Sequence, residues 1–202
     1  MDKNISLLPE NISRLVVLNA TDISLLEEHA RMRSFRKGDL INAPGEINRY
    51  TNLIVKGSAR TFYTDAEGNQ HNIQLGISNW WIGDYSSFIT QQQGLLYTEA
   101  LEATELISLS YESLQLIYDR SPATERFFRI MVQKAYASFQ NRILYNLSMD
   151  AETRYTQFSQ AYPEMDRHIA QKHIASYLGM SAEFLSKIKK RLVQKARKRA
   201  SV

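Results

Sequence analysis

The spacing of apolar residues divides the chain into a short helical segment, a β-rich segment and a long helical segment. Residues 9–30 carry apolar side chains at helical spacing, which predicts one or two short helices. From Met32 the pattern changes to short alternating runs separated by Gly, Pro and Asn, and helical spacing returns after Leu109. The fold class expected is therefore α+β. The first helices are expected to bury Leu15, Val16, Leu18, Ile23, Leu25 and Leu26.

The β-rich segment holds some eight strand candidates within about 80 residues, which is typical of a small antiparallel barrel or jelly roll. Two strands meet at Gly57, and Asp65–Asn69 forms a hairpin loop before a third strand. Further strands are expected at Trp80–Ile82, Leu95–Ala100 and Glu105–Leu109. We therefore expect this segment to form a β-roll.

A short helix at Tyr111–Asp119 precedes a long one from Pro122 to about Leu147 that is apolar on more than one side. Four of its apolar residues alternate four and three apart, as in a coiled-coil seam: Phe128, Val132, Ala135 and Phe139. This pattern favours a homodimer, with burial inside a monomer as the alternative. Asp150 can cap the next helix, so a domain boundary is expected near Ser148, which separates domains 1–148 and 149–202.

Residues Gln171–Lys190 have the pattern of a helix-turn-helix. Gly179 can provide a tight turn, and Ser181 can cap the second helix. The residues expected to face inward are Ile174, Ala175, Leu178, Leu185, Ile188 and Leu192. The outer face of the second helix then holds Ala182, Glu183, Ser186 and Lys187, and such a helix fits the major groove of DNA. The alternative is an ordinary helical hairpin inside a core.

Charge strengthens the DNA-binding interpretation. The segment from Phe184 to Val202 contains eight Lys and Arg and no acidic residue, although the whole chain has a net charge of only +4. A basic block that follows a recognition helix is suited to phosphate contacts. The chain has no Cys, no long apolar run and no signal-peptide pattern, so we expect a cytoplasmic protein that has no membrane partner.

An enzyme is not indicated. Small β-rolls also house metal-dependent enzymes, but of the four His residues only His71 lies in the β-rich segment. Ser86 and Ser87 have no His or acid at the spacing of a nucleophilic site, and no Gly-rich phosphate loop is present. We therefore expect no catalytic residues, no metal ligands and no cofactor.

The order of these parts resembles the catabolite-activator (Crp/Fnr) family of bacterial transcription factors. The resemblance rests on FRKGD and APGE within Phe35–Glu46, on LIVKGSAR at Leu53–Arg60, and on HIASYLGMSAEFLSKIKKRL at His173–Leu192. The last segment is similar to the branch of the family found in Bacteroidetes. The family implies a cyclic-nucleotide-binding-like sensor β-roll, a dimerisation helix at about residues 122–147 and a C-terminal helix-turn-helix domain.

The recognition helix of the family typically carries an Arg-Glu-x-x-x-Arg arrangement, which falls here on Ala182, Glu183 and Lys187. Of these, only the Glu is kept, so a half-site different from the family's usual one is expected. Lys172, Ser181 and Lys190 are then expected to contact phosphates. The residues after Leu192 are too few and too basic for the β-hairpin wing that usually follows, so a full wing is not expected.

The family's cassette for a cyclic nucleotide pairs Gly-Glu with a later Arg. Gly83 and Asp84 match the first part, but Gly94 stands where the Arg is expected, followed by Leu95. Phe139 and Gln140 stand where the family has a polar pair that meets the purine. Without a cation, cAMP binding of the usual kind is not expected. The effector pocket of this chain is expected to comprise Gly83, Asp84, Leu95, Leu96, Phe139 and Gln140.

The function expected is a homodimeric, sequence-specific transcription regulator that binds double-stranded DNA, with a palindromic operator and RNA polymerase as a further candidate partner. The β-roll either binds an apolar or uncharged effector or is filled by its own side chains. Two alternatives stay open. The first is a regulator dependent on cAMP or another small ligand in a non-standard pocket, where Arg60 or His71 replaces the missing cation. The second is a protein-interaction module without a specific DNA target.

Overall fold

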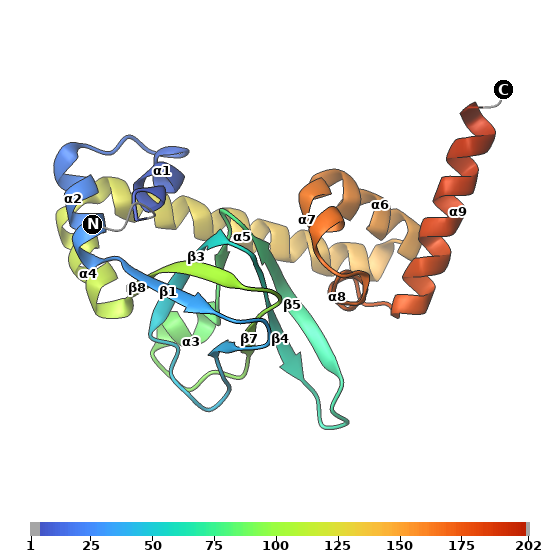
Figure 1. Ribbon diagram of the computed structural model, residues 1–202, viewed down its shortest axis with the longest axis horizontal. Helices are drawn as coiled ribbons and strands as arrows, with labels where there is room; N and C mark the ends of the chain where they lie inside the picture. The colour runs from blue at the N-terminus through green and yellow to red at the C-terminus, as the bar shows by residue number, and fades with distance from the viewer. Residues whose placement is uncertain (1–4, 201–202) are drawn as a thin grey trace. The chain divides into compact units, whose positions relative to one another are not determined.

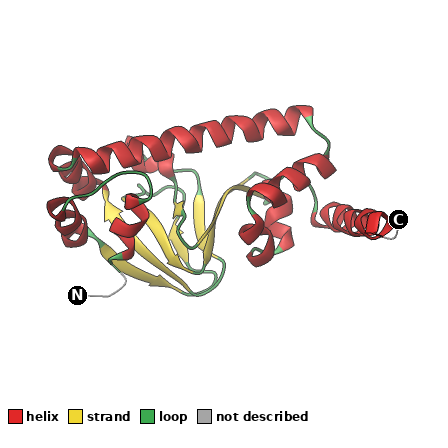
Figure 2. Cartoon of the chain, turned by 90° about the horizontal axis from the view of Figure 1, so that it is seen from above, coloured by secondary structure: helices red, strands yellow, loops and turns green. Residues whose placement is uncertain are grey.

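A computed structural model describes residues 5–200 of the chain and, of residues 196 and 198–200, the backbone only. The contacts divide it into two compact units, each described here by itself. The first comprises Met1–Tyr63 and Ile73–Ala137, and the second comprises Thr64–Asn72 and Ser138–Val202. Figures 1 and 2 show a β-roll bordered by helices and a separate group of helices. The α+β class expected from the sequence is confirmed.

Two short helices open the first unit: α1 (Leu7–Ser13) and α2 (Ala20–His29). A capping box starts α2, because Asn19 Oδ1 accepts a hydrogen bond from Asp22 N at 2.9 Å and Asp22 Oδ2 accepts one from Asn19 N at 3.0 Å. Leu25 and Leu26 are buried as predicted. The prediction that Leu15 is buried was wrong: it lies between the helices with 38% of its surface exposed, outside the periodicity of either one.

The β-roll consists of two four-stranded sheets, in the order β1-β8-β3-β6 and β2-β7-β4-β5. The strands are β1 (Arg31–Phe35), β2 (Leu40–Asn42), β3 (Tyr50–Lys56), β4 (Ser58–Thr64), β5 (Gln70–Ile77), β6 (Trp81–Ile82), β7 (Tyr97–Ala100) and β8 (Thr104–Ser110). The predicted break at Gly57 separates β3 from β4. Gly57 has φ +90°, and a Cβ there would lie 2.6 Å from Ala103 O, so this turn requires glycine.

Three further helices follow β6 in the chain before the second unit's own helices begin: α3 (Tyr85–Thr90), α4 (Tyr111–Arg120) and α5 (Pro122–Ser148). The N-terminal part of α5 contributes Phe127 and Phe128 to the core, where Trp81 lies edge-on to Phe128 with ring centroids 5.0 Å apart. Phe128 was predicted to begin a dimer seam. That prediction was wrong, because its side chain is only 2% exposed and already packs against the β-roll. Within the described residues, no helix combines the length and apolarity needed to cross a bilayer.

The second unit contains the C-terminal part of α5, α6 (Ala151–Ala161), α7 (Pro163–His168), α8 (Gln171–Tyr177) and α9 (Ala182–Ala200). Asp150 caps α6 as predicted, because its Oδ1 accepts a hydrogen bond from Thr153 N at 2.8 Å. The sequence did not predict α7, which is a single short helix beginning at Pro163. The domain boundary at Ser148, where α5 ends, stays a prediction, since the contacts group the end of α5 with the helices that follow.

The core of the second unit is built from α6, α7, α8, α9 and the turns between them. Its buried apolar residues are Tyr155, Phe158, Met165, Ile169, Ile174, Ala175, Leu178, Leu185 and Ile188. Residues 193–200, where the first strand of a wing would lie, continue α9 instead. Within the residues that the structure describes, helix and not a wing strand therefore follows the helix-turn-helix, and the basic segment is helical as far as Ala200.

Candidate nucleic-acid interface and effector cassette

The turn between α8 and α9 is fixed by local hydrogen bonds. Gly179 adopts φ +68°, and Met180 N donates to Ala175 O at 3.0 Å to close the end of α8. Ser181 caps α9, because its Oγ accepts a hydrogen bond from Phe184 N at 3.2 Å. The Gln171 side chain, which the sequence analysis did not single out, donates from Nε2 to Ala182 O at 2.9 Å. These contacts hold the start of α9 at a fixed angle to α8.

The predicted contact residues lie on the surface of this helix pair. Glu183, Lys187 and Lys190 are exposed on α9, and Ala182 and Ser186 are half-buried beside them. The predicted phosphate contacts Lys172, on α8, and Ser181, in the turn, are exposed as well. A hydrogen bond from its own backbone N–H, then one from Ser181 and the charge of Lys187, lower the pKa of Glu183. The face therefore presents an ionised carboxylate beside an ammonium group.

One lysine of the basic segment is held inside the unit. Lys189 Nζ donates to Asp166 Oδ1 at 2.9 Å and lies 5.2 Å from the centroid of the Tyr155 ring. The Tyr155 hydroxyl donates to Asp166 Oδ2 at 2.8 Å. Burial acts to lower the pKa of Lys189, but the hydrogen bonds to Asp166 and Tyr155 outweigh it and raise that pKa. Lys189 therefore positions α9 rather than extending the outer face.

The first residues of β5 bind α8 within the second unit. Ser176 Oγ donates to Gln70 O at 2.9 Å and accepts a hydrogen bond from Asn72 N at 3.0 Å. Asn72 Nδ2 in turn donates to His173 O at 2.9 Å. The β4–β5 loop is closed by Asp65, whose pKa is lowered to about 2, chiefly by a hydrogen bond to His71. Contacts over such sequence separations leave no periodic signal, so they were not predicted from the sequence.

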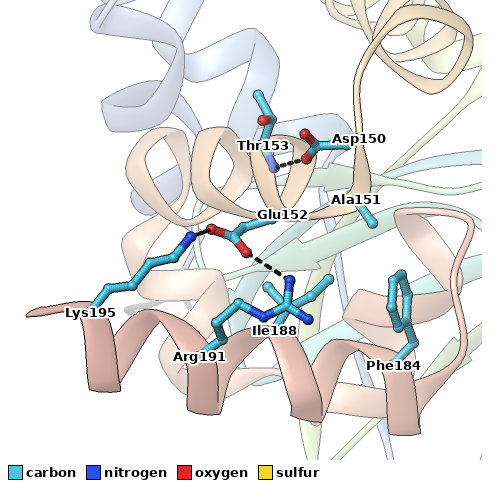
Figure 3. Close-up of a pocket in the computed structure, with 8 residues that line it drawn as sticks. All are labelled: Asp150, Ala151, Glu152, Thr153, Phe184, Ile188, Arg191 and Lys195. Atoms are coloured by element: carbon cyan, nitrogen blue, oxygen red, sulfur yellow. Dashed lines mark hydrogen bonds and ion pairs between the residues drawn. The ribbon is translucent and has the colours of Figure 1, made fainter.

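A groove of about 410 Å³ separates α9 from the start of α6 (Figure 3). Glu152 lies between two cations of α9: Lys195 Nζ donates to its Oε1 at 2.5 Å, and Arg191 Nη1 donates to its Oε2 at 3.3 Å. The hydrogen bond from Lys195, followed by the other contacts with these cations, lowers the pKa of Glu152. Phe184 lies at the opposite end of the groove and is 46% exposed. Neither Glu152 nor Phe184 was predicted from the sequence as a site residue.

The cassette in the first unit is closed by its own side chains. Asp84 is 2% exposed and caps α3, with Oδ1 accepting a hydrogen bond from Ser87 N at 3.1 Å. Its Oδ2 accepts one from Leu96 N at 3.3 Å. A Cβ on Gly94 would lie 2.4 Å from the same Oδ2, so the carboxylate occupies the space beside the position where the family has its arginine.

A second layer of hydrogen bonds supports Asp84. Asn48 Nδ2 donates to Asp84 O at 2.9 Å, while Asn48 N donates to Ser87 Oγ at 2.9 Å. The Ser87 hydroxyl donates to Gln92 O at 2.5 Å. Asn48, Asp84 and Ser87 are all buried. The cassette is thus a satisfied polar network and not a set of donors and acceptors directed at solvent.

The two cations considered as substitutes for the missing arginine both have acidic partners. Arg60 donates from Nε and Nη2 to Glu99 Oε2 at 2.8 and 2.6 Å, and its guanidinium lies 4.0 Å from the centroid of Phe62. His71 pairs with Asp65 at 2.7 Å in the hairpin tip. A phosphate at Arg60 would have to compete with a carboxylate that is already in place.

The other predicted pocket residues are distributed between the two units. Gly83 adopts φ +147° before Asp84, Leu96 is half-buried and Leu95 is 73% exposed, all in the first unit. Phe139 and Gln140 lie on the part of α5 that belongs to the second unit, and both are exposed. Whether the two groups share one pocket stays a prediction.

The C-terminal part of α5 carries an apolar stripe. Its members are 44 to 82% exposed and recur at helical spacing: Tyr136, Phe139, Ile143, Leu144 and Leu147. Of the predicted dimer seam, Ala135 and Phe139 are exposed, Val132 is half-buried and Phe128 is in the core. The exposed stripe therefore begins about two turns after Phe128, counting 3.6 residues per turn.

No protein-family model matches the chain, and no curated protein sequence matches it. Solved structures do. The c-di-GMP-responsive global regulator CLP of Xanthomonas campestris gives a TM-score of 0.69 at 16% identity, over 88% of this chain and 93% of that chain. A variant of CooA from Carboxydothermus hydrogenoformans gives 0.69 at 14% identity, over 96% and 86%. A CRP/FNR-family transcriptional regulator of Thermus thermophilus gives 0.63 at 18% identity, over 82% and 87%. The chain has the fold of these Crp/Fnr-type regulators.

Proposed function

We propose that this protein is a homodimeric, sequence-specific DNA-binding transcription regulator of the Crp/Fnr type. The observation that carries the proposal is the outer face of α9, where Glu183, Lys187 and Lys190 are exposed while Leu185 and Ile188 are buried. A helix so oriented can present its N-terminal half to base edges in the major groove. The shared fold of the Crp/Fnr-type regulators supports the same conclusion.

The apolar stripe on α5 supports the dimer. Large exposed apolar side chains at helical spacing are typical of a surface that another helix covers, and a two-fold dimer reads a palindromic operator. Within this proposal the protein acts in the cytoplasm, belongs to the Bacteroidetes-type branch and acts together with RNA polymerase. The domain boundary at Ser148 separates the sensor and dimerisation part from the DNA-binding part.

We further infer that the β-roll does not bind cAMP in the family's usual way. The Asp84 carboxylate already accepts hydrogen bonds from the backbone N–H groups of Ser87 and Leu96. Gly94 supplies no cation, and Arg60 forms an ion pair with Glu99. A cyclic phosphate would therefore meet carboxylates rather than an arginine. A different small effector in a non-standard pocket is the second candidate. The expected pocket comprises Gly83, Asp84, Leu95, Leu96, Phe139 and Gln140.

The test is to select preferred duplexes from a random DNA pool with the purified protein at physiological salt. Three parallel arms contain no nucleotide, cAMP, or c-di-GMP, to which one of the structural relatives responds. We expect a palindromic consensus in all three arms. A consensus that requires cAMP would overturn the inference about the cassette and leave the regulator proposal intact. Sequence-blind binding in every arm would overturn the regulator proposal and favour a protein-interaction module.

A further inference from the structure

The side chains of α9 divide into two neighbouring faces. At about 100° per residue, Arg191 lies roughly 40° around the helix from Lys187 and roughly 80° from Glu183. Arg191 is therefore at the border of the outer face, one step from the side chains proposed to read DNA. Lys195, one turn further on, follows the same line. By position alone, both cations would be expected to contact phosphates beside the major groove.

The structure directs both cations away from the outer face. Figure 3 shows Arg191 and Lys195 directed from α9 toward Glu152 in the first turn of α6, where each donates to a different oxygen of the same carboxylate. The two cations are a little more than half exposed, whereas the Glu152 side chain is 23% exposed. The Glu152 carboxylate is therefore the more restricted group, and the longer side chains of Arg191 and Lys195 reach it from α9.

The groove is not suited to bind a phosphate. Asp150 Oδ1 already accepts the hydrogen bond from Thr153 N at the start of α6, and Glu152 adds a second negative charge to the same turn. A phosphate at this helix start would be repelled by two carboxylates. Exposed ion pairs contribute little to the free energy of unfolding. The role of Glu152 is therefore to position the side chains of Arg191 and Lys195, and not to stabilise the fold.

We propose that Glu152 limits sequence-independent DNA affinity by withholding Arg191 and Lys195 from DNA phosphates. The inference rests on the proposed function and adds a residue to it. Sequence-independent affinity comes chiefly from cations that neutralise phosphates, while base contacts supply discrimination. A carboxylate that retains two cations lowers affinity for every duplex alike, and it leaves the contribution of Glu183 and Lys187 unchanged. The absolute affinity for every duplex is therefore lower, and the ratio of specific to non-specific binding stays the same.

The test uses the full chain and a random-sequence duplex of about 30 base pairs, with affinity measured at NaCl concentrations from about 50 to 200 mM. Each added phosphate contact steepens the slope of log K against log[salt] by about 0.9. Glu152→Gln should therefore steepen that slope by up to about 1.8. The ratio of variant to wild-type affinity for the random duplex should then be up to about tenfold larger at about 50 mM than at about 200 mM NaCl. Far-UV circular dichroism and thermal unfolding verify that each variant is folded.

Two controls separate this role from a change in net charge. Glu28→Gln removes the same charge from an exposed site on α2 and should leave the slope unchanged. In a background of Arg191→Gln and Lys195→Gln, adding Glu152→Gln should have no further effect, because the cations it would release are gone. This non-additivity is a readout that a purely structural role would not produce.

The outcomes distinguish this inference from the regulator proposal. Equal slopes for wild type and Glu152→Gln would overturn the role of Glu152, and a consensus selected by the wild type would still support the regulator. A steeper slope for Glu152→Gln in a protein that selects no consensus would support the ion-pair role and overturn sequence-specific regulation. Absence of DNA binding in both proteins at about 50 mM salt would overturn both.

Discussion

The cassette around Asp84 and the outer face of α9 use their polar side chains in opposite ways. In the cassette, Asp84 is buried and accepts hydrogen bonds from the backbone of Ser87 and Leu96. On α9, Glu183 and Lys187 are exposed, whereas Leu185 and Ile188 are buried. The polar groups of the cassette form hydrogen bonds within the protein, whereas those of α9 face solvent.

This difference shows how a site can be closed while its fold is kept. Buried polar groups need hydrogen-bond partners, and in the cassette the partners come from the protein's own backbone. A ligand would have to break those bonds before forming its own. On α9 a ligand displaces only water, so binding there requires no internal rearrangement.

Restoring the family's arginine should destabilise the protein and should not create a cAMP site. In Gly94→Arg, the new Cβ would lie 2.4 Å from Asp84 Oδ2 and 3.0 Å from Ser87 Cβ, so the cassette must shift. Overpacking of this kind costs about 2–3 kcal/mol in the free energy of unfolding. Chemical denaturation measures that loss, and isothermal titration calorimetry with cAMP should show no binding.

Leu95→Arg is the matched control, because it adds the same side chain one position later, where the residue is 73% exposed. It should change the free energy of unfolding by less than about 0.5 kcal/mol. A stable Gly94→Arg variant that binds cAMP would show that the cassette is open, and the contrast with α9 would then be lost.

Substitutions on α9 should separate base readout from phosphate contact. Glu183→Ala and Lys187→Ala should each relax preference at one base pair of the half-site, by about 1–2 kcal/mol of discrimination. Lys190→Ala should weaken binding to all duplexes and reduce the salt slope by about 0.9. Competition assays with single-base operator variants measure both effects. If the three variants behave alike, the orientation proposed for α9 is wrong.

Ser176→Ala tests the face of α8 that is already occupied. The change removes the hydroxyl that donates to Gln70 O and leaves Asn72 N without that acceptor. We expect a loss of about 1 kcal/mol in the free energy of unfolding, the typical contribution of such a hydrogen bond. Thermal unfolding measures it, with Ser186→Ala on the outer face of α9 as the control that should leave stability unchanged. Equal stability of the two variants would contradict the anchoring of the start of β5 to α8.

Local patterns predicted much of the fold. Alternating runs bounded by Gly, Pro and Asn marked the strands, and the capping residues Asp150 and Ser181 marked the starts of α6 and α9. The inward positions of the helix-turn-helix followed from helical spacing, and Leu185 and Ile188 are buried as predicted. The predictions that failed concern residues whose environment the local pattern leaves open. Phe128 packs in the β-roll core and not in a dimer seam, and Leu15 lies between two helices and is not buried.

Local sequence patterns were enough to predict most of the elements other than α7, their order and the outward face of α9, because each of these depends on residues close together in the chain. Which polar groups already have partners depends on contacts between distant parts of the chain. Glu152 meets Lys195 across 43 positions, and Asn72 meets Ser176 across 104. Asp84 receives Leu96 N twelve positions away, and Arg60 meets Glu99 across 39. Hydrophobic periodicity records which side of an element is buried, but hydrogen bonds and ion pairs form between atoms that the fold brings within about 3 Å.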